Sequence, residues 1–400
     1  MGRIVMMPPM LSPPNLPQWR CESGAPAPKR VVYGDDTLSA DTAYRLMCEG
    51  TAVLWQGDFN NARQLLQALA RRTQKSSHKK STQHRNTNQT IVTSADKPID
   101  TAQTFHLHRQ ALGQRARVLG LLLIPLDADY RIPLRRAPDM QDACLQAWGP
   151  PSGDARMISL RELLGLVGAY EWRKKGVEIP CLGKPPNNRI YPHYGVFSPV
   201  RGEYIDLVDN MPIRDKALAF DIGVGTGVLS ALLVKRGVQR VIATDQDPRA
   251  LSCARENLER LGVLPKIELV DIDLFPNDLA PLIVCNPPWV PARPTSPIEH
   301  AVYDEDSKML KGFLSGLRWH LTPDGEGWLI LSDLAEHLRL RSRETLLHWI
   351  DQGGLEVLER KDIKPRHGKT ADTEDPLHIA RAAEVTSLWR LGIKKKSNGA

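Results

Sequence analysis

Short apolar runs alternate with amphipathic segments along the chain after Ala217. The apolar runs predict buried strands, and the segments between them, whose apolar residues recur at helical spacing, predict crossover helices. This alternation is typical of an open parallel sheet wound with helices. The predicted strands are residues 217–220, 240–244, 267–270, 281–285, 328–332, 355–360 and 385–391.

The N-terminal half shows weaker patterns. Apolar residues at helical spacing predict a small helical unit over residues 37–72. Residues 73–101 are rich in Ser, Thr, Gln, Asn and Lys, a composition that predicts a flexible linker. A small α+β accessory domain is predicted over residues 102–190, and we expect it to recognise the substrate. Its predicted elements are a helix around 105–115, a strand over 118–126 and a helix over 160–174.

The remaining parts of the chain complete the predicted organisation. Residues 1–36 begin with a proline-rich stretch that lacks the apolar core of a signal peptide, and we expect a disordered leader there. Residues 191–393 hold the predicted parallel sheet and form the second domain. Residues 394–400 begin with three lysines and read as a basic tail.

Composition narrows the class of protein only slightly. A hydrophobic content of 42% and a charged content of 25% are those of an ordinary globular protein, and no apolar run is long enough to span a membrane. Six scattered cysteines form no CxxC pair, which favours a reduced, cytoplasmic compartment and predicts no metal site. The net charge of +7 mildly favours an anionic partner such as RNA or a ribosomal assembly.

The first chemical motif is a glycine-rich turn after the first strand of the second domain. Residues 217–227 read ALAFDIGVGTG, with Asp221 at the end of the strand and glycines at 223, 225 and 227. Gly223, Gly225 and Gly227 permit a tight turn and close approach of the backbone to a ligand. Asp245 ends the next strand, where a carboxylate can accept both hydroxyls of a ribose. A nicotinamide dehydrogenase would use similar geometry, but an acid followed by G-x-G-x-G resembles the first motif of class I methyltransferases.

The second motif follows the fourth strand of this domain. Residues 282–289 read LIVCNPPW, and the segment from Asn286 to Trp289 resembles the Asn-Pro-Pro-aromatic signature of N-methyltransferases. Pro287 and Pro288 make a stiff turn that can aim the Pro287 carbonyl and the Asn286 side-chain oxygen at one point. Two such acceptors hold both hydrogens of a planar NH2 group, and Trp289 offers a face on which that group can stack. We therefore predict these four residues as catalytic.

Together the two motifs predict the fold and the cofactor. The resemblance to class I methyltransferases implies an α/β fold with a Rossmann-like seven-stranded sheet, preceded by a helical or α+β domain. It also implies S-adenosylmethionine as the methyl donor. On this resemblance Asp221, the three glycines and Asp245 bind the cofactor, Asn286 contacts it, and Asp273, in a D-L-F pattern, contacts its adenine amine.

Further positions are predicted on the substrate side. Residues 195–208 read GVFSPVRGEYIDLV, which loosely resembles the entry segment of release-factor and ribosomal-protein glutamine methyltransferases and points to Pro199 and Arg201. Tyr303 follows the NPPW signature in the position of a substrate loop. Arg366 and His367 lie in a basic segment, KPRHGKT, that could bind phosphate or an acidic protein face.

Two classes of acceptor satisfy this chemistry. A glutamine amide in a translation factor or ribosomal protein agrees with the entry segment, whereas an exocyclic amine of a base in RNA or DNA, adenine first among them, agrees with the basic charge and the stacking tryptophan. The sequence leaves both open. A different class of function, a catalytically inactive module that keeps the methyltransferase fold to bind a partner, is the alternative.

Overall fold

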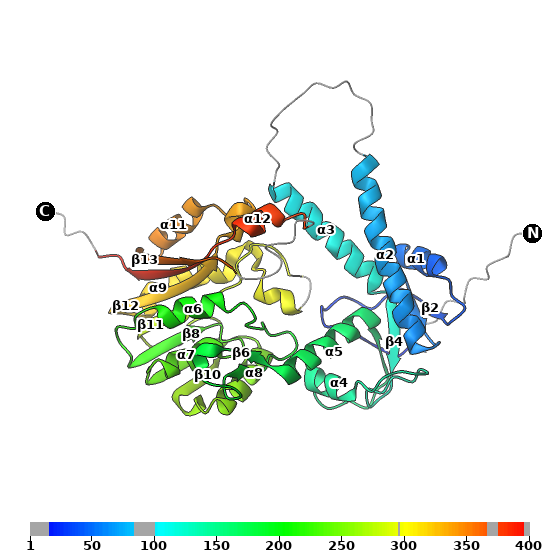
Figure 1. Ribbon diagram of the computed structural model, residues 1–400, viewed down its shortest axis with the longest axis horizontal. Coiled ribbons are helices and arrows are strands. Elements are labelled where there is room, and N and C mark those ends of the chain that lie inside the picture. The colour runs from blue at the N-terminus through cyan, green and yellow to red at the C-terminus, as the bar shows by residue number, and fades with distance from the viewer. Residues whose placement is uncertain (1–15, 84–100, 295–296, 366–374, 396–400) are drawn as a thin grey trace, which may run out of the picture. The chain divides into compact units, whose positions relative to one another are not determined.

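A computed structural model describes residues 16–83, 101–294, 297–365 and 375–395 of the chain (Figure 1). These residues form two compact units. Residues 16–83 and 106–171 belong to the first unit, and residues 101–105 and 172–395 belong to the second. Each unit is built around a sheet of its own.

The first unit contains a five-stranded sheet in the order β1-β5-β4-β3-β2. Neighbouring strands are parallel except for β4 and β5, which are antiparallel. The strands are β1 (Gln18–Arg20), β2 (Arg30–Gly34), β3 (Thr51–Trp55), β4 (Leu122–Leu126) and β5 (Arg156–Ser159). The helices are α1 (Ala40–Cys48), α2 (Phe59–Gln83), α3 (Thr101–Leu119), α4 (Gln141–Trp148) and α5 (Leu160–Lys175).

Secondary structure in the N-terminal half differs from the prediction at three places. Strands β1 and β2 lie within the predicted leader 1–36, of which residues 1–15 are outside the described part. Strand β3 lies inside the predicted helical unit 37–72; all five of its residues are buried, and a continuous apolar run does not distinguish a buried strand from a helix. Helix α2 extends into the predicted linker 73–101, because Arg, Gln and Lys readily prolong an existing helix.

Other elements of this half agree with the sequence. Helix α3, strand β4 and helix α5 confirm the three elements predicted between residues 105 and 174. Residues 84–100, the rest of the predicted linker, lie outside the described part of the chain. The domain boundaries after residues 36, 72, 101 and 190 stay predictions.

The second unit contains a seven-stranded sheet in the order β10-β9-β8-β11-β12-β14-β13. The first five strands in this order are parallel, and β14 is antiparallel to both of its neighbours. The strands are β8 (Leu218–Ile222), β9 (Arg240–Asp245), β10 (Ile267–Asp271), β11 (Ala280–Cys285), β12 (Leu321–Ser332), β13 (Leu355–Ile363) and β14 (Thr386–Ile393). All seven predicted strands, and the Rossmann-like α/β fold that they imply, are confirmed.

Helices and short elements connect these strands. The helices are α6 (Glu203–Asn210), α7 (Val228–Lys235), α8 (Pro248–Arg260), α9 (Lys308–His320), α10 (Leu334–His337), α11 (Arg343–Gln352) and α12 (His378–Ala383). Short strands β6 (Val177–Glu178) and β7 (Arg189–Ile190) form a separate hairpin, and single 3₁₀ turns occur at Pro180–Leu182, Leu264–Lys266, Pro297–Ala301 and Glu305–Ser307.

The seven-stranded sheet is covered by helices on both faces (Figure 1). Successive side chains of a strand point to opposite faces. Accordingly, Ala219 packs in a core cluster with residues of α6, α7 and α8, whereas Phe220 packs in a second cluster with residues of α9 and α11. Both faces of the central strands are therefore buried, which explains why the strands appear in the sequence as continuous apolar runs.

The strand order reverses beside β8, where β9 and β10 lie on one side and β11 on the other. Ligands of open α/β sheets bind at such a switch point, outside the carboxyl ends of the strands. Ile222 at the end of β8 lies opposite Thr244 on one neighbour and Cys285 on the other. The residues that follow, Gly223, Asp245 and Asn286, therefore leave the sheet at the same edge.

Candidate active site

The glycine turn after β8 has a backbone that other residues would adopt only under strain. Gly223, Gly225 and Gly227 have φ values of +78°, +53° and +81°. A methyl group placed on Gly223 would lie 2.9 Å from Met309 Cε, and one on Gly227 would contact Leu258, whereas one on Gly225 would meet no atom within 4 Å. Gly225 thus presents open backbone at the carboxyl edge, the position at which a ligand can approach closely.

Asp221 is a buried carboxylate at the base of this turn. Its side chain is 1% exposed, and its Oδ2 accepts a hydrogen bond of 2.6 Å from Ser230 Oγ on helix α7. Burial raises the pKa of Asp221 to about 7, because a carboxylate in an apolar interior loses its hydration. A positively charged ligand beside Asp221 would stabilise the ionised carboxylate and so lower its pKa again.

Asp245 at the end of β9 is joined to the same turn. Its Oδ2 accepts a hydrogen bond of 3.1 Å from the backbone N–H of Gly225, and its Oδ1 accepts one of 3.0 Å from Asp247. Burial raises the pKa of this carboxyl above its usual range. The structure therefore places the two acids and the glycine turn together, as the sequence predicts.

Thr244, which the sequence does not single out, joins strand β9 to the loops that follow β8 and β10. Its carbonyl oxygen accepts hydrogen bonds of 2.9 Å from the N–H groups of both Gly223 and Val224. Its hydroxyl donates a hydrogen bond of 2.6 Å to the carbonyl of Leu274, in the loop after β10. A single threonine at a strand end is a weak sequence signal, because these bonds arise only once the three strands are aligned.

The NPPW segment follows β11 directly beside the glycine turn. Pro287 is buried, while Asn286, Pro288 and Trp289 are half-buried. The indole Nε1 of Trp289 donates a hydrogen bond of 2.9 Å to Asn286 Oδ1. The Trp289 ring also packs against three separate hydrophobic clusters of the second unit, so its position is defined from several sides.

A strained segment precedes α9. Asp306 and Ser307 have φ values of +57° and +54°. Positive φ values are uncommon at non-glycine residues, and where they occur they are concentrated at functional sites. The Asp304 carboxylate accepts hydrogen bonds from the N–H groups of Met309, at 3.1 Å, and Leu310, at 3.2 Å. This cap fixes the start of α9 and places Met309 over Gly223.

Arg341 is a buried arginine that contacts this segment and the NPPW motif. It is 5% exposed, and its guanidinium lies 3.5 Å from Ser307 Oγ and 3.4 Å from the carbonyl oxygen of Trp289. Burial lowers its pKa from the ordinary value. Among the described residues its Nε has no hydrogen-bond partner.

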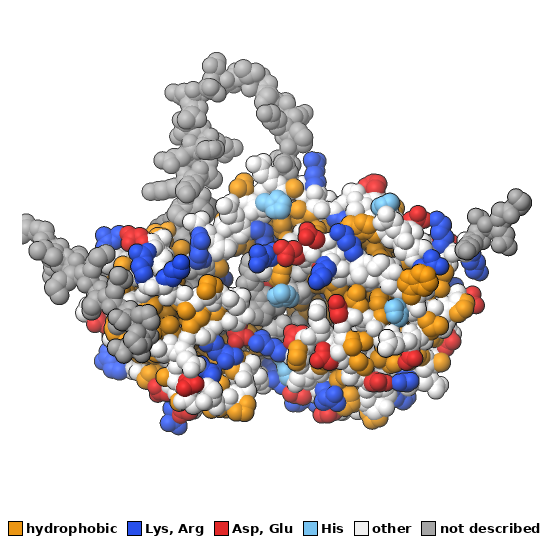
Figure 2. Space-filling view, turned by 180° about the vertical axis from the view of Figure 1, so that it is seen from behind, with side chains coloured by type: hydrophobic (Ala, Val, Ile, Leu, Met, Phe, Trp, Pro, Cys, Tyr) orange, Lys and Arg blue, Asp and Glu red, His pale blue; other side chains and the backbone are white. Residues whose placement is uncertain are grey.

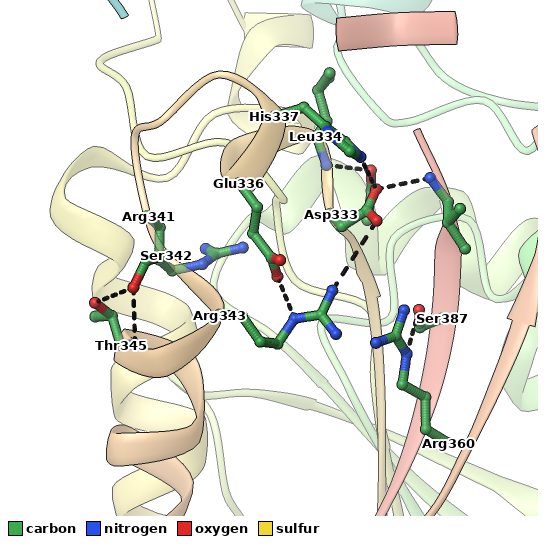
Figure 3. Close-up of polar contacts among 12 residues, drawn as sticks. Asp333, Leu334, Glu336, His337, Arg341, Ser342, Arg343, Thr345, Arg360 and Ser387 are labelled. Carbon is green, nitrogen blue, oxygen red and sulfur yellow. Dashed lines mark hydrogen bonds and ion pairs between the residues drawn. The ribbon is translucent and has the colours of Figure 1, made fainter. Parts of the chain in front are cut away.

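A charged network after β12 holds the chain that carries Arg341 (Figure 3). Arg343 Nε lies 2.7 Å from Glu336 Oε1, and Arg343 Nη2 lies 4.0 Å from Asp333 Oδ2. Asp333 Oδ1 also accepts a hydrogen bond of 2.7 Å from the N–H of Val385, just before β14. The network therefore ties residues 333–343 to the sheet.

The remaining predicted residues lie at various distances from this centre. Asp273 is exposed in the loop after β10. Pro199 is buried, and Arg201 lies 3.5 Å from Glu384 Oε1, near the end of β12. Tyr303 forms an isolated bridge with Val290, one residue after the signature.

Two predicted residues cannot be placed, and one further acid emerges. Arg366 and His367 lie outside the described residues. Glu203, at the start of α6, is 4% exposed, and its Oε1 has no hydrogen-bond partner among the described residues.

In the part of the chain that the structure describes, no group of three or more His, Cys, Asp or Glu side chains could hold a metal ion. None of the described helices is long and apolar enough to cross a membrane.

Comparison with known proteins identifies the class to which this site belongs. Residues 187–343 match the family model for the methyltransferase small domain. This part of the chain is therefore similar to methyltransferase small domains, and the resemblance predicted from the two motifs is confirmed. The match includes the glycine turn, both aspartates and the NPPW segment.

Curated relatives share only part of their length with the chain. A Methanocaldococcus jannaschii protein named as an N5-glutamine methyltransferase is 29% identical over 109 residues, or 27% of this chain and 54% of that protein. The ribosomal protein L11 methyltransferase of Haemophilus influenzae strain PittEE is 32% identical over 83 residues, or 20% of this chain and 28% of that protein. The chain thus matches about half of the first relative and less than a third of the second.

Solved structures are similar at lower identity. A ribosomal protein L11 methylase from Lactobacillus delbrueckii subsp. bulgaricus is 18% identical with a TM-score of 0.34, covering 48% of this chain and 78% of that one. The N-methyltransferase NodS from Bradyrhizobium japonicum, in complex with S-adenosylhomocysteine, is 17% identical with a TM-score of 0.32, covering 45% of this chain and 79% of that one.

Proposed function

We propose that the protein is an S-adenosylmethionine-dependent N-methyltransferase that methylates the side-chain amide of a glutamine in a protein of the translation machinery. The observation that carries the proposal is that the glycine turn and the NPPW segment are adjacent. The turn follows Ile222 and the segment follows Cys285, and these two residues are paired on neighbouring strands at the switch point of the sheet. A cofactor over the turn and an acceptor amide at Asn286 would then lie side by side.

The residues present fit this cofactor. Asp221 and Glu203, whose Oε1 has no partner among the described residues, would supply two buried carboxylates for its ammonium group, and Asp245 would supply acceptors for its ribose hydroxyls. The open face of Gly225 leaves room for close approach, and Asp273 would contact the adenine amine. When bound, S-adenosylmethionine supplies a methyl group activated by a sulfonium centre.

The acceptor chemistry follows from two oxygens. An amide nitrogen is a poor nucleophile, because its lone pair is conjugated with the carbonyl group. The side-chain oxygen of Asn286 and the carbonyl oxygen of Pro287 would accept its two N–H groups, which orients the nitrogen and stabilises the positive charge that develops on it. Trp289 would supply an aromatic face beside the planar amide, and Pro288 keeps the turn stiff.

Two observations support a protein acceptor over a nucleic-acid base. The relatives that match this chain carry names of methyltransferases that act on protein glutamine or on ribosomal protein L11. Figure 2 shows basic and acidic side chains interspersed on the visible side of each unit, so the described residues there form no continuous basic surface within a unit for a phosphate backbone.

We further propose roles for the substrate-side residues. Pro199, Arg201 and Tyr303 would border the acceptor segment, and Arg366 and His367 would contact an acidic face of the acceptor protein. The accessory region before residue 191 would recognise the acceptor. The protein would act in the cytoplasm, where translation proteins are made.

A labelling experiment tests this proposal. Lysate of a strain that lacks the protein is incubated with purified protein and tritiated S-adenosylmethionine, and the label is then divided by protease and nuclease digestion. We expect the label in protein, with N5-methylglutamine in its hydrolysate, and none with the Asn286→Ala variant. Label released by nuclease would show a nucleic acid as the acceptor and would overturn the proposal. Absence of both labelling and S-adenosylhomocysteine binding would show a catalytically inactive module.

A further inference from the structure

We propose that the indole N–H of Trp289 is a positioning group that selects the orientation of the Asn286 carboxamide. This inference rests on the proposed N-methylation and gives the tryptophan a role beyond that of an aromatic face. Its basis is the hydrogen bond from Trp289 Nε1 to Asn286 Oδ1, 2.9 Å long. Because an amide oxygen accepts two hydrogen bonds, Oδ1 keeps one position for an N–H of the acceptor.

The orientation of Asn286 decides whether the site can hold an NH2 group. The two ends of a carboxamide have nearly the same shape, but one end accepts hydrogen bonds and the other donates them. The torsion that exchanges them is broad and roughly two-fold, so the side chain alone does not choose between the ends. In the reversed orientation the NH2 group of Asn286 would face one N–H of the acceptor, and no hydrogen bond would form between these two donors.

Tryptophan is suited to make this selection. Its indole N–H only donates, so it pairs with the oxygen of Asn286 and not with the NH2 group. Phenylalanine at this position would keep an aromatic face but would lack a donor. Tyrosine would carry a hydroxyl that both donates and accepts, and it would therefore not distinguish the two ends of the carboxamide.

The donor is itself held in place by the core. The Trp289 ring contacts three hydrophobic clusters, and Arg341 donates to the Trp289 carbonyl oxygen at 3.4 Å. The chain around Arg341 is fixed in turn by Asp333 and Arg343 (Figure 3). Pro287 and Pro288 restrict the backbone between donor and acceptor. The packed core thus determines the orientation of the Asn286 side chain.

The hydrogen bond can be observed without an acceptor. The indole N–H signals of the nine tryptophans are recorded by NMR on protein labelled with 15N in tryptophan, and the signal lost in Trp289→Phe identifies Trp289. We expect Asn286→Ala to shift this signal more than any other and to speed its exchange with solvent. An unchanged Trp289 signal in Asn286→Ala would overturn the proposal.

The functional consequence is measured on the same variants. With lysate and tritiated S-adenosylmethionine at saturation, we expect Trp289→Phe to transfer label about 10- to 100-fold more slowly, because the acceptor is misaligned. Its S-adenosylhomocysteine affinity and thermal midpoint should equal those of Trp349→Phe, a matched change at a half-buried tryptophan on α11.

The outcomes separate this inference from the proposed function. A parent rate in Trp289→Phe would overturn the positioning role and leave the proposed function intact. A loss of cofactor affinity in that variant would show a merely structural role and overturn it too. A parent protein that transfers no label would overturn the proposed function, while the indole signal would still show whether the bond to Asn286 exists.

Discussion

The carboxylate of Asp245 accepts a hydrogen bond from the backbone N–H of Gly225, with 3.1 Å between Gly225 N and Asp245 Oδ2. The bond joins the loop that follows β8 to the end of the neighbouring strand β9. It fixes the acid that we assign to the ribose relative to the glycine that we expect to face the ligand, so the proposed cofactor site is organised before a ligand enters.

We expect Asp245→Ala to weaken S-adenosylhomocysteine binding about 10- to 100-fold, the effect of losing charge-assisted hydrogen bonds to a ligand. Isothermal titration calorimetry measures this. Asp247→Ala removes a carboxylate two residues away that caps α8, and it should retain nearly the parent affinity. Equal losses in the two variants would show only a general effect of charge.

Gly225 and Gly262 provide a matched pair. Both have positive φ, +53° and +67°, and neither has an atom within 4 Å of the position of an added methyl group. Alanine at either position should therefore cost about 1–2 kcal/mol of stability through backbone strain. Only Gly225→Ala should also weaken cofactor binding, by roughly tenfold or more. Thermal denaturation and calorimetry report the two effects, and equal affinities in the two variants would contradict the assignment.

Asp221 should make both stability and binding depend on pH. Its pKa is raised to about 7 in the folded protein, so its favourable contribution to folding is fully present below about pH 4, its unfolded value, and is lost as pH rises through 7. Asp221→Asn should therefore gain stability relative to the parent between pH 5 and pH 8.

Cofactor binding should show the opposite trend with pH. Ionised Asp221 is the form that pairs with an ammonium group, so the parent's affinity for S-adenosylhomocysteine should fall as pH drops below 7. Asp221→Asn should lack this trend across the same calorimetric series. A parent affinity that does not change from pH 5.5 to pH 8.5 would speak against contact between Asp221 and the ammonium.

Glu326 tests a structural element away from the site. It is 5% exposed and accepts hydrogen bonds of 2.8 and 2.6 Å from Arg390, which is 6% exposed. Glu326→Ala removes the buried carboxylate that pairs with the buried Arg390 guanidinium. The variant should therefore lower the free energy of unfolding by about 3 kcal/mol. Asp351→Ala removes an exposed partner of Lys394 and should have little effect on stability. Denaturant titration compares them, and cofactor affinity should be retained in both.

The sheet of the second unit could be predicted from the sequence because its strands are buried on both faces. Leu282 to Cys285, for example, form an apolar run that ends in a motif of specific spacing. The same burial makes β3 in the first unit hard to recognise as a strand from the sequence. Thr51 to Trp55 lie between two helices in the chain and continue the apolar pattern of these helices. Strand and helix are not distinguished by such a run alone.

The sequence predicts those residues of the candidate site that belong to a short motif of recognisable spacing. Asp221, Asp245 and the glycines are recognisable from spacing, and the structure brings them to one edge. The bonds of Thr244 to Gly223 and Leu274, and the contact of Arg341 with the NPPW turn, depend on loops far apart in the sequence. Only the assembled sheet creates them.

The proposed methyl transfer depends most directly on Asn286. Asn286→Ala should bind S-adenosylhomocysteine nearly as tightly as the parent in calorimetry, because Asn286 is only one of several residues that we expect to contact the cofactor. It should transfer no tritium from S-adenosylmethionine in the labelling assay, because the acceptor loses one of its two hydrogen-bond partners. Transfer by this variant at the parent rate, or a loss of cofactor affinity as large as that of Asp245→Ala, would contradict the account.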